Sequence, residues 1–268
     1  MLTGAIALTL GGFGTATVAR AQQAASPAGA AARQFAEATG LQNQEQFDKA
    51  ADAWQVFLKE HPSDPRADRA WHHLGVCRLK NKQYAEAQAA FERLIADQPK
   101  SALASSAWLN LGLAQYDQAA AGQTELYAKA AETFVTLLEK FPRSNEVSRA
   151  LFYRAESLYA QSKNAEAAKL YADFIRKYPQ DPLLADALYA QGVALQELGS
   201  HAAAGASYDA WLKQFADHAQ AAEVIFRRGE TLLAQGNSEA AEKWFASAAA
   251  RPSFALADLA LLRQAACL

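Results

Sequence analysis

Residues 71–99, WHHLGVCRLKNKQYAEAQAAFERLIADQP, contain the pattern from which the fold of the whole chain follows. Apolar side chains recur every three or four positions in two runs, which predicts two amphipathic helices joined by a tight turn. The first run contains Gly75, and the second contains Ala87 with Phe91 one turn later. Small residues let two antiparallel helices approach closely, and large residues fill the space beside them. Because Pro99 cannot continue a helix, the stretch predicts a helical hairpin that ends there.

The same pattern recurs along the chain. The residues that stop each second helix lie 36 to 43 positions apart, and an alanine replaces the proline in one of them: Pro62, Pro99, Pro142, Pro179, Ala216 and Pro252. A small residue, followed four positions later by an aromatic residue, precedes each stop: Ala50 and Trp54, Ala87 and Phe91, Ala130 and Phe134, Ala167 and Tyr171, Ala204 and Tyr208, and Ala240 and Trp244. Such regular spacing predicts an array of about six helical hairpins.

This pattern resembles the tetratricopeptide repeat, in which W-x2-L-G-x2-Y on a first helix is followed by A-x3-F and a proline on the second. Residues 71–99 match it, except that Arg78 stands in the place of the tyrosine. The resemblance covers residues 33–252. It implies an all-α fold, a right-handed α-solenoid of about six helix-turn-helix repeats plus a terminal helix.

Two features depart from the usual repeat length of about 34 residues. Extra residues precede each first helix, where Asp64 and Asp181 stand directly before a proline and are expected to cap the helix. Ser101 and Ser144 are expected to cap the corresponding helices of other repeats. An insertion within residues 117–124 lengthens the third repeat and predicts a loop or a helix extension between its two helices.

The N-terminal region predicts export. Residues 1–21 are apolar but rich in Gly and Thr, which makes a membrane-spanning helix the poorer alternative. They end in Ala-Arg-Ala, a small-x-small cleavage site, so we interpret them as a signal peptide even though no basic residue precedes the apolar run. Residues 22–32 are of low complexity and predict a flexible leader. The mature chain is then expected in the periplasm or otherwise exported, without an integral membrane span.

The C-terminal residues 253–268 predict a strongly apolar helix that contains Leu256, Leu259, Leu261 and Leu262. The end of a repeat array needs a polar outer face because no further repeat covers it. Two interpretations stay open: this helix is the cap of the array, or it is the first helix of a further, truncated repeat.

Composition and motifs argue against several function classes. The formal net charge of −2 and the pI near 6.2 give no basic face for nucleic acid. The five histidines lack metal-ligand spacing, and adjacent His72 and His73 point about 100 degrees apart on a helix, too far apart to hold one metal. No phosphate-binding glycine loop and no nucleophile motif occurs. We therefore expect no catalytic residue, no cofactor and no metal, and the two cysteines, Cys77 and Cys267, suggest no disulfide framework.

The resemblance implies that the first helix of each repeat lines a concave groove. At the positions that would face it, the sequence offers these candidate partner-binding residues: Phe35, His72, Leu109, Tyr116, Phe152, Tyr159, Tyr189 and Phe226. Rigid aromatic side chains bury a large area at a small entropic cost, so the groove would suit an extended peptide or a helix of a partner protein. The alternative is that curvature of the array buries these residues between neighbouring repeats.

The best-known peptide site of the family is a clamp of Lys, Asn and Arg that grips a C-terminal carboxylate. Phe35 and Thr39 stand in the place of its first Lys and Asn, so recognition of chaperone tails is not implied. The spacers FPRS at 141–144 and YPQD at 178–181 are similar to those of bacterial envelope tetratricopeptide proteins, of the Tol-Pal-associated and the outer-membrane-assembly lipoprotein type. This resemblance implies a non-catalytic scaffold that binds an envelope protein. The alternative is the repeat arm of a larger enzyme or assembly whose catalytic part lies outside this sequence.

Overall fold

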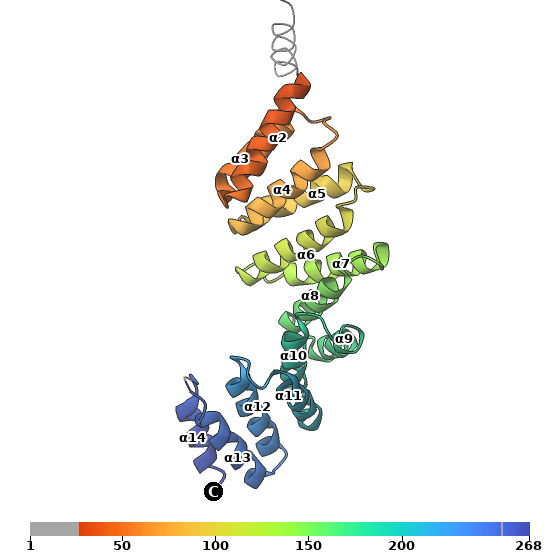
Figure 1. Cartoon of the computed structure of the whole chain (residues 1–268). Coiled ribbons are helices and arrows are strands. Elements are labelled where there is room, and N and C mark those ends of the chain that lie inside the picture. Colours follow the sequence, from red (N-terminus) through yellow and green to blue (C-terminus); the bar gives the residue numbers. More distant parts are fainter. Residues whose placement is uncertain (1–26, 253) are drawn as a thin grey trace, which may run out of the picture. The chain divides into compact units, whose positions relative to one another are not determined.

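A computed structural model describes residues 27–252 and 254–268 of the chain. Within these ranges it contains thirteen α-helices, α2 to α14, and no β-strand (Figure 1). The described residues divide into two compact units, with the boundary between Ala104 and Ser105. The predicted signal peptide, residues 1–21, lies outside the described residues.

In its described part, the first unit contains two helical hairpins: α2 (Pro27–Asn43), α3 (Phe47–Glu60), α4 (Ala67–Lys80) and α5 (Tyr84–Asp97). Each helix packs against the next along the chain. The core lies around Trp54 and Phe57, which are both fully buried. Because α2 begins at Pro27 and buries Ala31, part of the stretch predicted as a leader, residues 22–32, is helical instead.

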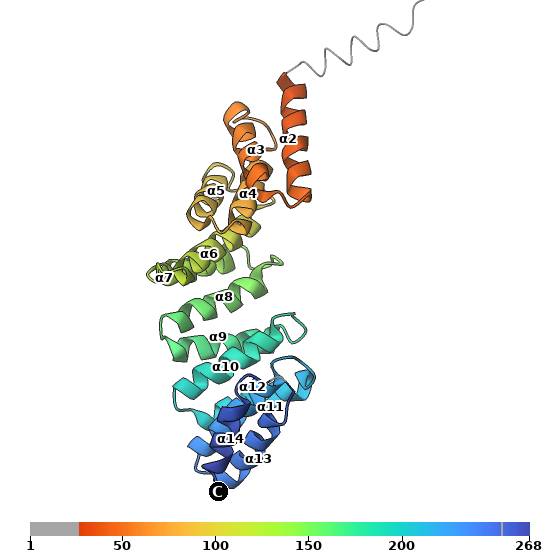
Figure 2. The ribbon, with the colours of Figure 1, turned by 90° about the vertical axis from the view of Figure 1, so that its left-hand side faces the viewer.

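The second unit continues the same order: α6 (Ala104–Ala120), α7 (Leu126–Lys140), α8 (Val147–Ala160), α9 (Asn164–Lys177), α10 (Leu184–Glu197), α11 (His201–Phe215), α12 (Ala221–Ala234), α13 (Ser238–Ala249) and α14 (Ala257–Ala265). From α7 to α14 each helix packs against its successor. The hairpins α8/α9, α10/α11 and α12/α13 follow one another in Figure 2. The predicted all-α solenoid of helix pairs is confirmed.

Close approach of the two helices explains the small residue of the pattern. In four hairpins this residue is a glycine, and a Cβ atom built on it would lie under 3.0 Å from the ring of the aromatic residue on the second helix. The pairs are Gly75 and Phe91, Gly112 and Phe134, Gly192 and Tyr208, and Gly229 and Phe245. All four rings are fully buried. The aromatic ring therefore occupies the space that a larger residue on the first helix would need.

The last of these pairs corrects the predicted alignment of the sixth repeat by one position. Ala241 and Phe245 are fully buried, whereas the predicted Ala240 and Trp244 are half-buried. Adjacent Trp and Phe residues made both registers acceptable in the sequence. Packing of Phe245 against Gly229 selects one of them.

Every hairpin turn uses one residue at positive φ after the first helix. These residues are Glu45, Lys82, Gly122, Ser162, Gly199 and Gly236. In the fourth hairpin the Ser162 N–H donates to the Tyr159 carbonyl at 2.8 Å. The Lys163 N–H donates to the Leu158 carbonyl at 3.0 Å. This pair of bonds is the Schellman motif, which satisfies carbonyl groups that a helix end leaves unpaired.

The residues before the first helices form turns, not the predicted helix caps. Asp64 Oδ1 accepts a hydrogen bond from the Arg66 backbone N–H at 2.9 Å, and Asp181 Oδ1 accepts one from the Leu183 N–H at the same distance. The two serines predicted as caps accept the same kind of bond. The helices begin three residues after each aspartate, so these side chains stabilise Asx turns outside the helices.

The insertion predicted within residues 117–124 extends a helix: α6 continues to Ala120 before the turn at Gly122. At the far end of the unit, α14 packs against α13 and buries Ala260, while Leu261 and Leu262 are 53% and 65% exposed. Within the described residues, no helix combines the length and the apolar character needed to cross a bilayer.

Candidate functional site

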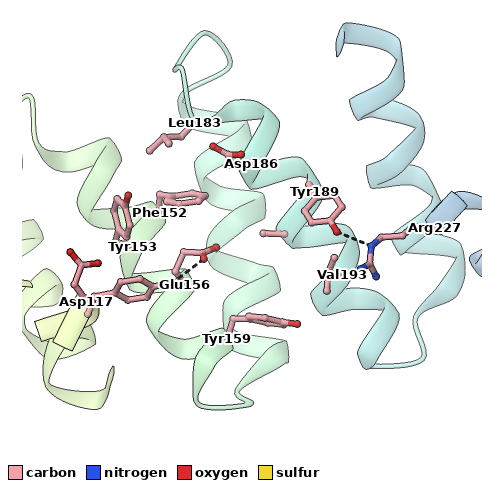
Figure 3. A pocket seen from close by; sticks show the side chains of 12 residues that line it. Asp117, Phe152, Tyr153, Glu156, Tyr159, Leu183, Asp186, Tyr189, Val193 and Arg227 are labelled. Carbon is pink, nitrogen blue, oxygen red and sulfur yellow. Dashed lines mark hydrogen bonds between the residues drawn. The ribbon is translucent and has the colours of Figure 1, made fainter. Parts of the chain in front are cut away.

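A hollow of about 610 Å³ lies in the second unit and is lined by α6, α8, α10 and α12, with one residue from the turn before α10 (Figure 3). These are the first helices of four successive hairpins. Phe152, Glu156 and Tyr159 are spaced by four and three positions, so they share one face of α8. Asp186 and Tyr189 lie one turn apart on α10. Helical periodicity therefore directs one stripe of α8 and one of α10 into the hollow, while α6 contributes Tyr116 and Asp117 and α12 contributes Arg227.

Aromatic side chains form much of the wall: Tyr116, Phe152, Tyr153, Tyr159 and Tyr189. The Tyr153 ring centroid lies 5.6 Å from that of Tyr116 and 5.4 Å from that of Phe152, with interplanar angles of 71° and 89°. Such edge-to-face contacts are favourable for aromatic pairs. They hold the rings of α6 and α8 against one another.

Glu156 is a polar centre of this wall. Its Oε1 accepts a hydrogen bond from the Tyr171 hydroxyl at 2.5 Å, and its Oε2 accepts one from the Tyr116 hydroxyl at 3.5 Å. Burial raises the pKa of Glu156 above its ordinary value, while the two phenol donors oppose this by stabilising the carboxylate. Burial also raises the pKa of both tyrosines, which keeps their hydroxyls protonated as donors.

Arg227 on α12 borders the hollow on the side opposite Asp117 (Figure 3). Its Nε donates to the Tyr189 hydroxyl and to a Glu223 carboxylate oxygen, both at 2.8 Å. The guanidinium carbon lies 5.4 Å from the centroid of the Tyr189 ring. Glu223 therefore compensates the positive charge of Arg227 within the protein.

The lining carries three carboxylates, those of Asp117, Glu156 and Asp186, and a single arginine. Burial raises the pKa of the Tyr153 hydroxyl, and the charges of all three carboxylates add to this effect, while exposed Arg149 acts against it. Asp117 and Asp186 form no ion pair with any residue in the described part of the chain. The hollow is therefore acidic as well as aromatic.

The structure brings four of the predicted groove residues together at this hollow: Tyr116, Phe152, Tyr159 and Tyr189. Their binding to a partner stays a prediction. Sequence reasoning missed Asp117, Tyr153 and Arg227, each directly next to a predicted position in the sequence, and Asp186, which lies one turn before Tyr189. The groove register that predicts Phe152 and Tyr159 also includes Glu156, one turn after Phe152, and the structure places it at the hollow.

Leu109 and Phe226, also predicted to face the groove, lie in the core. Leu109 is 1% exposed and belongs to the cluster around Phe134. Phe226 is 7% exposed, with its ring centroid 5.5 Å from Phe245 and 6.1 Å from Phe254. For these two positions the alternative, burial between neighbouring helices, is the correct one.

Phe35 and His72 belong to the first unit. The ring centroids of Phe35 and Trp54 are 4.8 Å apart, and the Arg66 guanidinium carbon lies 4.8 Å from the Phe35 ring centroid. The His72 ring lies 5.9 Å from that of Phe91. Burial is the main cause that lowers the pKa of His72 to about 4, and the charge of neighbouring His73 is the second cause. The His72 imidazole is therefore neutral near pH 7. Both residues pack within their own unit.

No cluster of three or more His, Cys, Asp or Glu residues suited to a metal ion occurs among residues 27–252 and 254–268. The chemistry that the hollow offers is non-covalent: aromatic faces for apolar or cationic groups, and carboxylates for hydrogen-bond donors and positive charge.

A family model described as tetratricopeptide repeat matches the chain in five overlapping stretches, residues 35–102, 78–123, 118–182, 154–219 and 189–255. A comparison with curated protein sequences gave no match.

Several solved structures share the fold. PilW, described as a widely conserved type IV pilus biogenesis factor, has a TM-score of 0.62 at 17% identity, over 87% of this chain and 98% of PilW. YrrB, described as a protein with an unusual peptide-binding site, has a TM-score of 0.56 at 20% identity, over 77% of this chain and 95% of YrrB. MamA has a TM-score of 0.57 at 17% identity, over 68% of this chain and 90% of MamA. At these identities the likeness concerns the fold alone.

Proposed function

Because the chain belongs to the tetratricopeptide repeat family, we propose that it is a non-catalytic scaffold that binds a partner protein in the hollow of its second unit. One observation carries this proposal: the hollow of about 610 Å³ is lined by side chains from four successive first helices. A row of neighbouring helices presents side chains at successive points along the array, which suits a linear ligand such as an extended peptide or a helix.

The preformed wall favours binding for an energetic reason. Edge-to-face contacts and tyrosine–carboxylate hydrogen bonds within the protein fix Tyr116, Tyr153 and Glu156. Little side-chain freedom is therefore lost when a ligand arrives, and this saving is a main determinant of affinity at interfaces. Large aromatic side chains at the centre of a concave surface are also the usual sites of strong interface contacts.

We further propose that the partner is a protein of the bacterial cell envelope. The predicted signal peptide at residues 1–21 and the spacers at 141–144 and 178–181 support this part of the proposal. They are the features by which the sequence resembles envelope proteins of the Tol-Pal-associated and outer-membrane-assembly lipoprotein type. The fold likeness to the pilus biogenesis factor PilW is compatible with it.

A photo-crosslinking experiment in living cells tests the proposed site. A photoreactive phenylalanine analogue replaces Tyr159 in the hollow, and in the matched control it replaces Lys169, an exposed residue on α9. We expect a distinct crosslinked protein from position 159, identified by mass spectrometry, and none from position 169. Equal crosslinking from both positions, or none from position 159, would reject the hollow as the binding site.

The identified partner then allows a direct measurement. With purified proteins, Phe152→Ala combined with Tyr189→Ala should raise the Kd at least about tenfold, since buried aromatic anchors carry a large share of interface energy. Lys169→Ala should leave the Kd unchanged. Circular dichroism of each variant checks that the fold is retained.

A further inference from the structure

We propose that the hollow recognises a basic segment of the partner, whose lysine or arginine side chain lies beside the Tyr153 ring, where the charges of Asp117, Glu156 and Asp186 act together. This inference rests on the proposed function, because it specifies the chemistry of the peptide that the hollow accepts.

Charge complementarity is the first argument. Asp117, Glu156 and Asp186 line the hollow, and the positive charge of Arg227 is already paired with Glu223 at 2.8 Å. An acidic peptide would therefore meet like charges, which strongly disfavours association. A cationic side chain would supply the partner that Asp117 and Asp186 lack among the described residues.

The burial of these carboxylates is the second argument. Burial raises the pKa of both Asp117 and Glu156, because the charged forms have lost part of their hydration. An arriving cation restores favourable electrostatic contact to groups that are already desolvated. It therefore gains more from them than it would from fully hydrated surface carboxylates.

The aromatic wall is the third argument, and it points to the same ligand. Lysine and arginine have long apolar stems that pack on rings, and their charged ends are attracted to aromatic faces. Tyr116, Phe152 and Tyr153 lie within 6 Å of their ring neighbours and supply such a surface next to Asp117. A neutral apolar peptide would match the rings but leave the carboxylates without a partner.

Selection from a random peptide library displayed on phage tests the proposal, with the full chain as the immobilised target. The wild-type chain is compared with Asp117→Asn combined with Asp186→Asn. The matched control is Asp173→Asn combined with Asp209→Asn, because these aspartates lie on second helices, outside the hollow, and pair with Arg176 and Arg228. We expect lysine or arginine to be enriched at one fixed peptide position with the wild type and the control, and not with the Asp117 and Asp186 variant.

The best wild-type peptide is then synthesised with lysine or arginine, or with glutamine, at the enriched position. For the wild type, the change to glutamine should raise the Kd about tenfold, and for the Asp117 and Asp186 variant less than about twofold, as in a double-mutant cycle. Two outcomes would overturn the basic-segment inference while leaving the binding groove intact. One is enrichment of acidic residues. The other is enrichment of peptides without a charge preference, provided that Phe152→Ala abolishes this enrichment. Absence of any enriched peptide, or enrichment that Phe152→Ala leaves unchanged, would instead count against the proposed groove itself.

Discussion

Three of the four predicted groove residues that line the hollow are tyrosines, and the fourth, Phe152, is 6% exposed. The Tyr159 hydroxyl donates to Glu197 at 2.6 Å, and the Tyr189 hydroxyl accepts a bond from Arg227. Tyrosine combines an apolar ring with a hydroxyl that needs a partner, so it lies where core and solvent meet. Leu109 and Phe226 have no such polar end, and at equivalent positions of their helices they lie in the core.

Histidine burial in the first unit predicts a pH dependence of stability. The pKa of His72 is about 4 in the folded chain, mainly because of burial, against about 6.5 in an unfolded chain. Between these two values the unfolded state binds a proton that the folded state does not, so the free energy of unfolding falls as the pH is lowered from 6.5 towards 4. The expected loss is up to about 3 kcal/mol.

Urea unfolding of the full chain at pH 7 and pH 4.5 measures this effect. Hydrogen exchange of the backbone amides in α4 is the readout. In the variant His72→Gln the difference in stability between the two pH values should be smaller than in the wild type. The control His218→Gln changes an exposed histidine of the second unit and should behave like the wild type. An unchanged pH difference in His72→Gln would show that this imidazole is not the group responsible.

Pairs of helices are the elements from which both units are built, and each pair depends on one close contact. The Tyr208 ring on α11 is fully buried against Gly192 on α10, and its hydroxyl donates to Gln196 at 3.0 Å. The ring is therefore held at both ends and cannot move easily to admit a larger neighbour. The turns between paired helices tolerate more variation, since a serine or a lysine can replace glycine at the residue of positive φ.

Substitution of Gly192 by alanine should destabilise the second unit by about 1–2 kcal/mol. Overpacking of a filled core costs about 1–3 kcal/mol, and the better helix propensity of alanine returns up to about 1 kcal/mol. The control is Gly40→Ala in α2, where a Cβ atom would meet no other atom within 4 Å and the stability should stay unchanged or rise. Urea unfolding followed by circular dichroism compares them, and equal stabilisation by both changes would contradict the packing argument.

At the scale of the whole molecule, helices within each unit contact mainly their neighbours in sequence, so effects of binding are expected to remain local. With the best peptide from the library selection, hydrogen exchange should slow in α8 and α10 of the second unit. Exchange in α3 and α4 of the first unit should stay unchanged. Hydrogen exchange with detection by mass spectrometry measures both regions in one experiment, and protection confined to the first unit would contradict the assignment of the site.

The sequence by itself determined the helical hairpins and their order, because glycine, aromatic and proline residues at fixed spacing permit only one way to pair the helices. Through the resemblance to the tetratricopeptide repeat it also predicted Tyr116, Phe152, Tyr159 and Tyr189 as groove-facing residues, and these four line the hollow. Even so, it could not choose between adjacent aromatic residues in the sixth repeat.

Only the tertiary structure decided which of the candidate groove residues line the hollow and which are buried, and that the hollow is acidic. Asp117, Glu156 and Asp186 belong to three different helices, and their common action on Tyr153 depends on how those helices pack. Charges that are far apart in sequence add up only when packing brings them within a short distance in a partly desolvated space. Periodicity along a single helix carries no information on that distance.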